Sequence, residues 1–308
     1  MEQATWVIAE KPQDYPALCA IARTLGVPVT AVWAGAQDDC AAVAGCGADK
    51  VLCAPLADGE LYEQAFGAVV EAAQAAAPRA VLLASTKRLR LGAARLGVAL
   101  GTKAVNDAAS ITLEDGALVT ERMVYGGSAN CRERMAEGTA IVLVSEGLLA
   151  AQQPAGGADA PVEMLPAAAP SAMALVERSP RTVEAVNLAA ARRIVSVGRG
   201  IRAKDDLQMI DALAALLEAE VGCTRPLAEG EDWLSRERYI GVSGVMANPD
   251  LFIALGLSGQ VQHMVGASGS RTIVVVNKDK AAPVFKYADY GIVGDLYEVV
   301  PALSAALA

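Results

Sequence analysis

The stretch LFIALGLSGQVQHMVGA, residues 251–267, decides the fold class of this sequence. Its first five residues are all apolar, which is typical of a strand buried on both faces of a parallel sheet. Glycine and serine dominate residues 256–259, and a helix is predicted to begin near Gln260. A strand that passes through a glycine-rich loop into a helix is the repeating unit of a doubly wound α/β sheet.

The same unit recurs through the C-terminal part of the chain. Because the carboxyl ends of parallel strands meet at one edge of the sheet, the loops after these strands are expected to line one ligand site. The predicted strands are 194–197, 221–224, 239–242, 251–255, 272–277 and 290–293, and the predicted helices are 205–219 and one that begins near Asp295.

The N-terminal part alternates in the same way and then gains a hairpin. The pair Asp115-Gly116 separates two strand-like runs, 110–114 and 118–123, and Asp-Gly is a strong signal for a two-residue β-hairpin. We therefore predict an α/β protein with two doubly wound domains, a Rossmann-like N-terminal one with an antiparallel hairpin extension and a C-terminal one with a parallel sheet. The other N-terminal strands are predicted at 6–9, 29–33, 51–53, 81–84 and 140–144, and the helices at 13–25, 38–44, 60–76 and 89–100.

The length of the chain and the positions of its prolines indicate where the domains end. A chain of 308 residues suits two domains of ordinary size. Residues 147–186 are rich in proline and alanine, which is typical of a linker without regular structure. We expect the first domain at 1–146 and the second at 187–308.

The overall composition excludes several functions. With 54% hydrophobic and 20% charged residues the chain is globular, and its net charge of −9 disfavours nucleic acids and anionic membranes as partners. The single histidine, His263, excludes sites that need two imidazoles, and no metal site is predicted. The N-terminus lacks a signal-peptide pattern and no apolar stretch reaches about 18 residues, so we expect a cytoplasmic protein without a membrane span.

The six cysteines follow no spacing that is typical of a ligand set. None of them form a CxxC pair. In a chain of this length we expect them to be reduced, mostly buried thiols. Iron–sulfur ligation by Cys40, Cys46 and Cys53 is the less favoured alternative, because such ligands usually lie closer together in sequence.

Three loops after second-domain strands carry glycine, hydroxyl or arginine groups. Residues 198–200, GRG, let backbone N–H groups and an arginine approach a phosphate, although a plain turn fits as well. Arg225, fixed by Pro226, is either an anion ligand or a surface arginine. Residues 240–244, IGVSG, bring Ser243 to the sheet edge, but they do not match a GxSxG nucleophile elbow and also suit a plain turn.

The remaining loops carry the most polar side chains. Within 256–266, Gln262 and His263 fall near the start of a helix, where the imidazole either caps backbone or, as we favour, hydrogen-bonds a cofactor ring. Asn277 and Asp295 follow the next two strands and suit ribose hydroxyls, although Asp295 also suits a helix N-cap. Six such loops at one sheet edge indicate an elongated ligand with phosphates and a polar ring system, as in a dinucleotide.

These segments resemble the alpha subunit of the electron-transfer flavoprotein family, over nearly the whole chain. The third loop reads GVSG (241–244) where the mitochondrial-type pattern reads GQTG, and with AEGEDWLSRERY (228–239) it is similar to the bacterial Fix-type branch, associated with carnitine and acyl-CoA metabolism. The segments that carry the resemblance are SVGRG (196–200), GCTRP (222–226), GLSGQVQHMVGA (256–267), VVNKDKAAPVF (275–285) and YADYGIVGDLYEVVPAL (287–303), with NDA (106–108) and MVYGG (123–127) in the first domain.

The resemblance implies FAD bound mainly by the second domain and a role as an electron carrier rather than a substrate-converting enzyme. It implies a beta-subunit partner that packs on the first domain and holds AMP or, in bifurcating complexes, a second FAD. The redox partners it implies are acyl-CoA dehydrogenases or reductases, or a quinone-linked oxidoreductase. The residues it places at the FAD are Arg199, Thr224, Arg225, Ile240, Gly241, Val242, Ser243, Ser258, Gly259, Gln260, Val261, Gln262, His263, Asn277 and Asp295.

Three of these residues are expected to tune the flavin rather than to react. The resemblance implies that Ser243 lies near the flavin N5, and we expect Arg225 over the ring near N5 and His263 donating a hydrogen bond near the C2 carbonyl. Val242 lacks the polar group of the mitochondrial-type Gln, which implies a different flavin environment. Two rival functions are an NAD-dependent oxidoreductase and a non-enzymatic nucleotide-binding protein of the universal-stress type.

Overall fold

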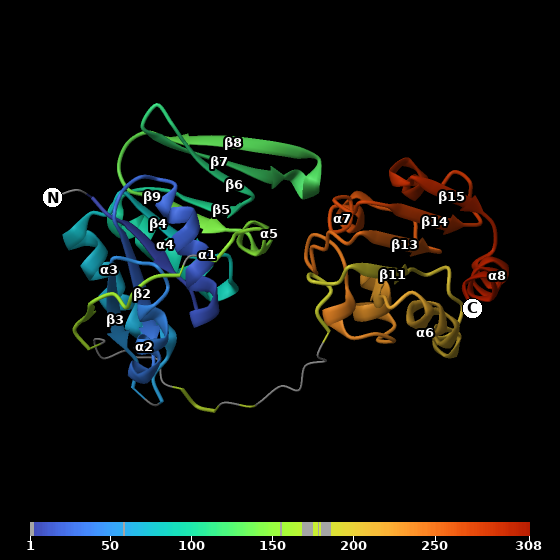
Figure 1. Ribbon diagram of the computed structural model, residues 1–308, viewed down its shortest axis with the longest axis horizontal. Coiled ribbons are helices and arrows are strands. Elements are labelled where there is room, and N and C mark those ends of the chain that lie inside the picture. The colour runs from blue at the N-terminus through green and yellow to red at the C-terminus, as the bar shows by residue number, and fades with distance from the viewer. Residues whose placement is uncertain (1–2, 58, 155, 168–174, 178, 180–185) are drawn as a thin grey trace. The chain divides into compact units, whose positions relative to one another are not determined.

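The chain forms two compact units, each built around its own parallel sheet (Figure 1). This confirms the prediction of an α/β protein with two doubly wound domains. One unit comprises Met1–Val124 and Asn130–Ser179, and the other comprises Tyr125–Ala129 and Pro180–Ala308. The computed structural model describes residues 3–57, 59–154, 156–167, 175–177, 179 and 186–308.

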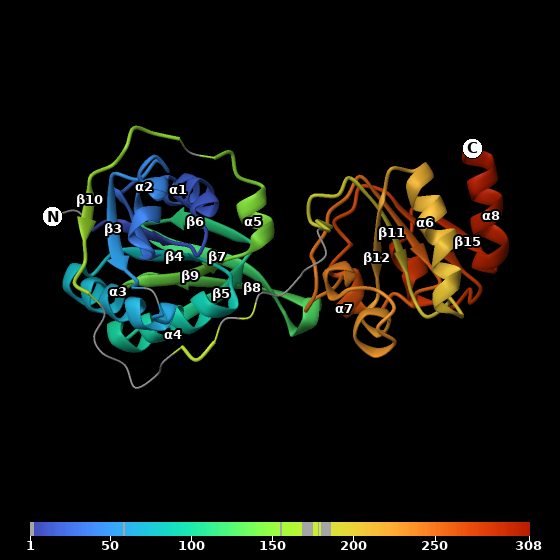
Figure 2. The same ribbon diagram turned by 90° about the horizontal axis from the view of Figure 1, so that it is seen from below.

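The first unit contains a seven-stranded parallel sheet in the order β10-β3-β2-β1-β4-β9-β5. Its central strands are continuous apolar runs because helices cover both faces, α1 and α2 on one and α3 and α4 on the other (Figure 2). The strands are β1 Thr5–Ile8, β2 Val29–Gly35, β3 Lys50–Pro55, β4 Ala80–Ala84, β5 Ala104–Ala108, β9 Ala140–Val144 and β10 Val162–Met164. The helices are α1 Tyr15–Arg23, α2 Cys40–Ala44, α3 Tyr62–Ala76, α4 Lys87–Leu100 and α5 Glu146–Ala150.

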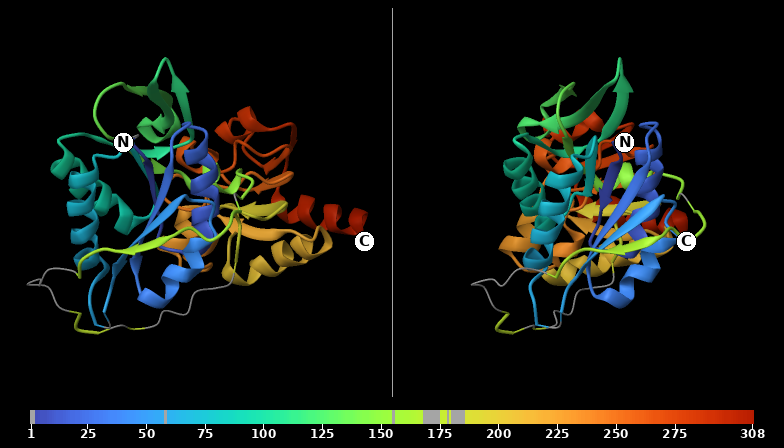
Figure 3. Two further views of the ribbon diagram at one scale, coloured as in Figure 1. Left: turned by 60° about the vertical axis from the view of Figure 1, so that its left-hand side comes forward. Right: turned by 90° about the vertical axis from the view of Figure 1, so that its left-hand side faces the viewer.

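The predicted hairpin is present as part of a separate three-stranded sheet, β6-β7-β8, at the top of both views in Figure 3. Strand β6 (Ser110–Glu114) pairs antiparallel with β7 (Ala117–Val124), and β8 (Ala129–Met135) lies next to β7. Asp115 and Gly116 have φ values of 47° and 77°, as a type I′ turn requires. The sequence did not predict β8.

The stretch 147–186 corrects the expectation of a linker without regular structure. Helix α5 covers its start, where the Ser145 hydroxyl accepts a hydrogen bond from the Leu148 N–H at 3.2 Å. Strand β10 then joins the sheet beside β3, because the backbone of this segment finds partners that proline and alanine content does not reveal. Residues 168–174, 178 and 180–185 of the expected linker lie outside the described residues.

The cysteines correct a second expectation. Cys40 and Cys53 form a disulfide between α2 and β3, so these two residues are neither reduced thiols nor iron–sulfur ligands here. Cys19 and Cys46 are buried thiols whose sulfur atoms lie 3.5 Å apart. Cys223 is also buried, whereas Cys131 is half-buried. Spacing in the sequence did not indicate the disulfide because the two residues meet only through the packing of α2 on β3.

The second unit contains a five-stranded parallel sheet in the order β12-β11-β13-β14-β15. Its strands alternate between two apolar cores: Val195 and Val197 pack in the one with α6 and α8, and Ile194 in the one with α7. The strands are β11 Arg193–Val197, β12 Glu220–Cys223, β13 Leu251–Leu255, β14 Ile273–Asn277 and β15 Tyr290–Val293, and the helices are α6 Leu207–Leu216, α7 Val261–Met264 and α8 Leu296–Leu307.

The strand predicted at 239–242 is wrong. Only two isolated bridges form there, Cys223 with Tyr239 and Ile240 with Val245. The chain turns at once because Gly241 and Gly244 let the backbone pass close to Tyr239, where an added Cβ would lie within 3 Å of that residue. No helix in the described part of the chain is long and apolar enough to cross a membrane.

Candidate functional site

The loops that follow the second-unit strands enclose one cavity of about 690 Å³. This volume lies within the range of about 300–1,000 Å³ that is usual for small-molecule sites. The cavity stands at the carboxyl ends of the strands, which is where doubly wound sheets bind ligands. It is lined by Arg199, Gly200, Arg202, Thr224, Arg225, Pro226, Tyr239, Val242, Ser243, Gly256, Leu257, Ser258, Gly259, Gln260, Gln262, His263, Val276, Asn277, Lys278, Asp279, Ala282, Pro283, Asp295 and Leu296.

Twelve of the fifteen residues that the sequence placed at the site line this cavity. The other three, Ile240, Gly241 and Val261, do not. The Ile240 side chain is fully buried in the apolar core, so it supplies only its carbonyl. The Gly241 N–H is used by the Val245 carbonyl, at 3.1 Å. Val261 begins α7 with a side chain that is 39% exposed and outside the cavity lining.

Twelve of the lining residues were not among those expected, and four of the twelve are polar or charged: Arg202, Tyr239, Lys278 and Asp279. Lys278 directly follows Asn277 at the end of β14, and its position in the strand-end loop was a usable signal. Arg202 lies in the loop after β11, and Tyr239 comes from the segment that was taken for a strand. The other eight are apolar residues or glycines, and they include Pro283 in the loop after β14, for which the sequence offers no signal.

The loops after β11 and β13 meet backbone to backbone, and glycine makes this approach possible. The Gly200 N–H donates to the Gly256 carbonyl at 2.8 Å, and a Cβ on Gly200 would lie 2.6 Å from the Gly256 Cα. Gly259 has a φ of +75°, and a Cβ there would lie 2.3 Å from the Val284 Cα. Glycine is therefore required at these positions by the close packing of the loops on one another.

The hydrogen bond made by the imidazole of His263 defines the protonation of this ring. Its Nδ1 lies 2.9 Å from the Ile240 carbonyl oxygen, which can only accept, so Nδ1 carries the proton. Burial lowers the pKa of His263 to about 4, against the opposing effect of that hydrogen bond, so the ring is neutral at pH 7. The buried Nε2 has no hydrogen-bond partner among the described residues. His263 thus carries a buried unsatisfied polar atom, and the residue is one of those that line the cavity.

This tautomer corrects the expected role of His263 as a donor. With the proton on Nδ1, the Nε2 of the neutral ring can only accept a hydrogen bond. The ring donates from Nε2 only after it takes up a second proton. Sequence could not show this, because the tautomer is set by the carbonyl of Ile240, 23 residues away.

Ser243 lines the cavity with Tyr239 beside it. The Tyr239 hydroxyl lies 3.3 Å from the Ser243 Oγ, and the tyrosine is only 4% exposed. Val242, next in the same turn, is 49% exposed and contributes an apolar surface. The tyrosine ring inside the turn thus holds the serine hydroxyl in place.

Replacement of Tyr239 by Phe is expected to destabilise the protein by about 1 kcal/mol, because it removes one hydrogen bond and keeps the ring. Urea unfolding followed by circular dichroism measures the change. Tyr290→Phe is the matched control, because that tyrosine is 67% exposed on β15 and should change stability little. Equal losses in the two variants would refute the contact with Ser243.

Arginine and acidic side chains pair at two points of the cavity. The Arg225 Nε donates to a Glu229 carboxylate oxygen at 2.6 Å, so this guanidinium is held by its own chain. Arg202 pairs with Asp295 at 2.8 Å, and its guanidinium lies 4.4 Å from the centre of the Tyr297 ring. Both arginines remain among the lining residues.

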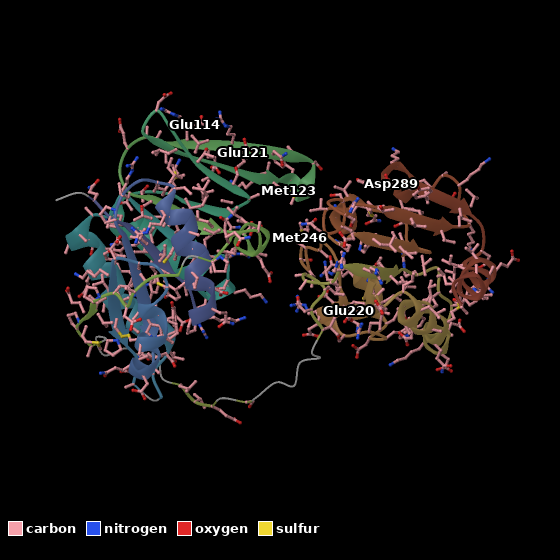
Figure 4. All side chains as sticks on the ribbon, in the orientation of Figure 1. Glu114, Glu121, Met123, Glu220, Met246 and Asp289 are labelled. Atoms are coloured by element: carbon pink, nitrogen blue, oxygen red, sulfur yellow. A yellow bond between two sulfur atoms is a disulfide. The ribbon has the colours of Figure 1, made fainter. Side chains whose placement is uncertain are left out.

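Asp295 and Asn277 combine structural and lining roles. Asp295 is the N-cap of α8, where its Oδ1 accepts from the Tyr297 N–H at 3.0 Å, so the capping interpretation is confirmed. The Asn277 amide donates to the Leu257 carbonyl at 2.8 Å and ties β14 to the loop after β13. By contrast Asp289, labelled in Figure 4, lies at the opposite edge of the sheet, where it accepts from the Ile273 N–H.

The charge of the cavity is opposite to that of the chain. The protein carries a net charge of −9, yet four lining side chains are cationic and two are acidic. A cationic cavity suits an anionic ligand such as a phosphate ester. The cationic residues are Arg199, Arg202, Arg225 and Lys278, and the acidic ones are Asp279 and Asp295.

Comparison with known proteins agrees with this geometry. The profile of the "Electron transfer flavoprotein FAD-binding domain" matches residues 187–268, and that of the "Electron transfer flavoprotein domain" matches residues 13–170. The first match supports a flavin as the ligand of the second unit.

Several relatives match over almost their full length. YdiR of Escherichia coli K12, provisionally named an electron transfer flavoprotein subunit, is 42% identical over 99% of this chain and 98% of its own. Protein FixB of Salmonella typhimurium LT2 is 40% identical over 99% of this chain and 98% of its own. Protein FixB of Shigella flexneri is 39% identical over 98% of this chain and 97% of its own. The chain therefore belongs to the electron transfer flavoprotein family, as an alpha-type subunit similar to the Fix proteins.

Proposed function

We propose that this electron transfer flavoprotein subunit binds FAD in the cavity of the second unit and carries electrons between redox partners. The observation that supports this most directly is that the loops after the second-unit strands line one cavity in which cationic side chains outnumber acidic ones. Phosphates would neutralise the excess of positive charge, and a polar ring system would find hydrogen-bonding side chains such as Ser243 and Gln262 among the lining residues.

The residues present fit the parts of FAD. Arg199 in the loop after β11 and Lys278 in the loop after β14 suit the pyrophosphate. The carboxylate of Asp295 retains lone pairs beyond those used by Arg202 and the Tyr297 N–H, and suits a ribose hydroxyl. We therefore infer FAD rather than a smaller flavin.

The chemistry is supplied by the cofactor, since a bound flavin accepts and releases electrons singly or in pairs. The protein side chains bind and tune it. His263 is buried and lines the cavity, and we infer that its Nε2 takes up a proton when negative charge develops beside it. Ser243 offers a hydroxyl that Tyr239 holds in place. Arg225 supplies positive charge.

The rival function of an NAD-dependent oxidoreductase fits the site less well. Such an enzyme needs a proton donor or acceptor that works near neutral pH beside its substrate. The pKa of His263 is lowered to about 4, and its Nδ1 proton is committed to the Ile240 carbonyl. The site thus favours an electron carrier over a substrate-converting enzyme.

We further propose how the chain is organised and partnered. Residues 187–308 form the FAD-binding domain, and residues 1–146 pack on a beta subunit that holds AMP or a second FAD. The redox partners are acyl-CoA dehydrogenases or reductases, or a quinone-linked oxidoreductase, in the cytoplasm. Similarity to YdiR and the Fix proteins over nearly the whole chain supports an alpha-type role in such a complex.

Co-expression with the beta subunit tests this function. The purified complex is expected to be yellow, to release FAD on denaturation, and to be bleached by a reduced acyl-CoA dehydrogenase. The amount of FAD released per complex measures how much of the alpha chain is loaded. The isolated beta subunit is the control, because it shows how much nucleotide that subunit holds by itself. A colourless complex that gains no flavin on incubation with FAD would contradict the proposal.

A further inference from the structure

Glu229 contacts a lining residue of the cavity without lining the cavity itself. One of its carboxylate oxygens accepts from the Arg225 Nε at 2.6 Å, and the other lies 3.2 Å from the Arg236 Nε. The hydrogen bond from Arg225 lowers the pKa of Glu229, so the carboxylate is ionised at neutral pH. Each oxygen of Glu229 thus faces a different guanidinium.

The backbone explains why these side chains meet. Residues Pro226–Gly230 form a single π-helical turn, closed by a hydrogen bond from the Glu231 N–H to the Pro226 carbonyl at 2.8 Å. Arg225 caps the start of this turn, which brings the side chain four residues later back against it. Single π turns are uncommon and are often found at functional sites.

We propose that Glu229 is a positioning residue that holds Arg225 beside the cavity and partly neutralises its charge there, and that it thereby sets the reduction potential of the flavin. The inference rests on the proposed function, since it requires a flavin in the cavity. Glu229 engages only the Nε–H of Arg225, which leaves the other four guanidinium donors for the ligand.

The direction of the effect follows from charge. A cation beside the cavity stabilises reduced flavin, which can carry negative charge, relative to oxidised flavin, which is neutral at the ring. The carboxylate of Glu229 opposes that stabilisation. Arg236 offsets part of the carboxylate in turn, because it pairs with the second oxygen. Removal of the Glu229 charge is therefore expected to raise the potential.

The first experiment compares Glu229→Gln with Glu231→Gln in the complex with the beta subunit. Both variants lose one negative charge at the same turn, but Glu231 is not in contact with Arg225 in either of the ion pairs described here. In Glu229→Gln, spectroelectrochemical titration is expected to show that the equilibrium constant between reduced and oxidised flavin rises about tenfold. This corresponds to a one-electron reduction potential that is higher by about 59 mV. Glu231→Gln is expected to remain at the wild-type potential.

A second comparison tests whether Glu229 acts through Arg225. In an Arg225→Gln background, Glu229→Gln is expected to leave the potential unchanged, because the group it positions is absent. Glu229→Asp, which keeps the charge, should remain close to wild type and also serves if Glu229→Gln does not fold. An unchanged potential in flavin-loaded Glu229→Gln, or an equal shift in the Arg225→Gln background, would overturn the proposal. A wild-type complex without flavin would instead overturn the proposed function.

Discussion

Acidification from pH 7 to pH 4 is expected to destabilise the protein by about 3 kcal/mol through His263 alone. The unfolded imidazole titrates near its ordinary pKa of 6.5, whereas burial lowers the folded pKa to about 4. Between these values the unfolded chain binds a proton that the folded chain does not. Stability that is fully present above pH 6.5 is therefore lost as the pH falls toward 4.

The variant His263→Asn tests this prediction by comparison with the wild-type protein. An asparagine amide can still donate to the Ile240 carbonyl, as Nδ1 does at 2.9 Å, but it does not titrate. Urea unfolding at pH 7 and pH 4 gives the loss of stability for each protein, and the difference between the two losses isolates this residue from all other groups. We expect wild type to lose about 3 kcal/mol more than the variant. Equal losses would show that the ring is not held neutral.

Replacement of Arg199 by Gln is expected to weaken FAD binding by about 10- to 100-fold, or about 1.5–3 kcal/mol, because it removes a charge-assisted hydrogen bond to a phosphate. Arg199 lines the cavity in the loop after β11. Titration of FAD into the deflavinated complex, followed by flavin fluorescence, measures the dissociation constant.

Two further variants separate a direct contact from a general charge effect. Lys280→Gln removes the same charge from an exposed residue that is not part of the cavity lining. It should bind FAD within about twofold of wild type, since exposed charges at a distance are screened. Arg199→Lys keeps the charge but loses the planar fork, so partial weakening is expected. Equal weakening by Arg199→Gln and Lys280→Gln would argue against a phosphate contact.

The sequence predicted the elements that local pattern determines. Strands β13 and β15 have the predicted bounds, because an apolar run between glycines or polar residues leaves little choice of position. The Asp115-Gly116 turn was equally clear, since both residues adopt positive φ. The cavity lining was largely predictable as well, because parallel strands place the loops that follow them at one edge.

What the sequence did not predict depends on contacts between distant residues. Strand β10 forms because β3 offers its edge, and the disulfide forms because α2 packs on that same strand. The tautomer of His263 depends on a carbonyl in another loop. The pairing of Arg225 with Glu229 depends on a π turn, a conformation that no local sequence pattern marks.

The double role of Asp295 makes the C-terminal helix a reporter of the ligand. Its carboxylate caps α8 and also lines the cavity, so a hydroxyl bound there would fix the carboxylate more firmly against the first turn. Binding in the cavity would then slow amide hydrogen exchange at Tyr297 while the far end of α8 exchanges as before. The occupancy of the cavity can thus be followed at a backbone amide, without a spectroscopic signal from the ligand.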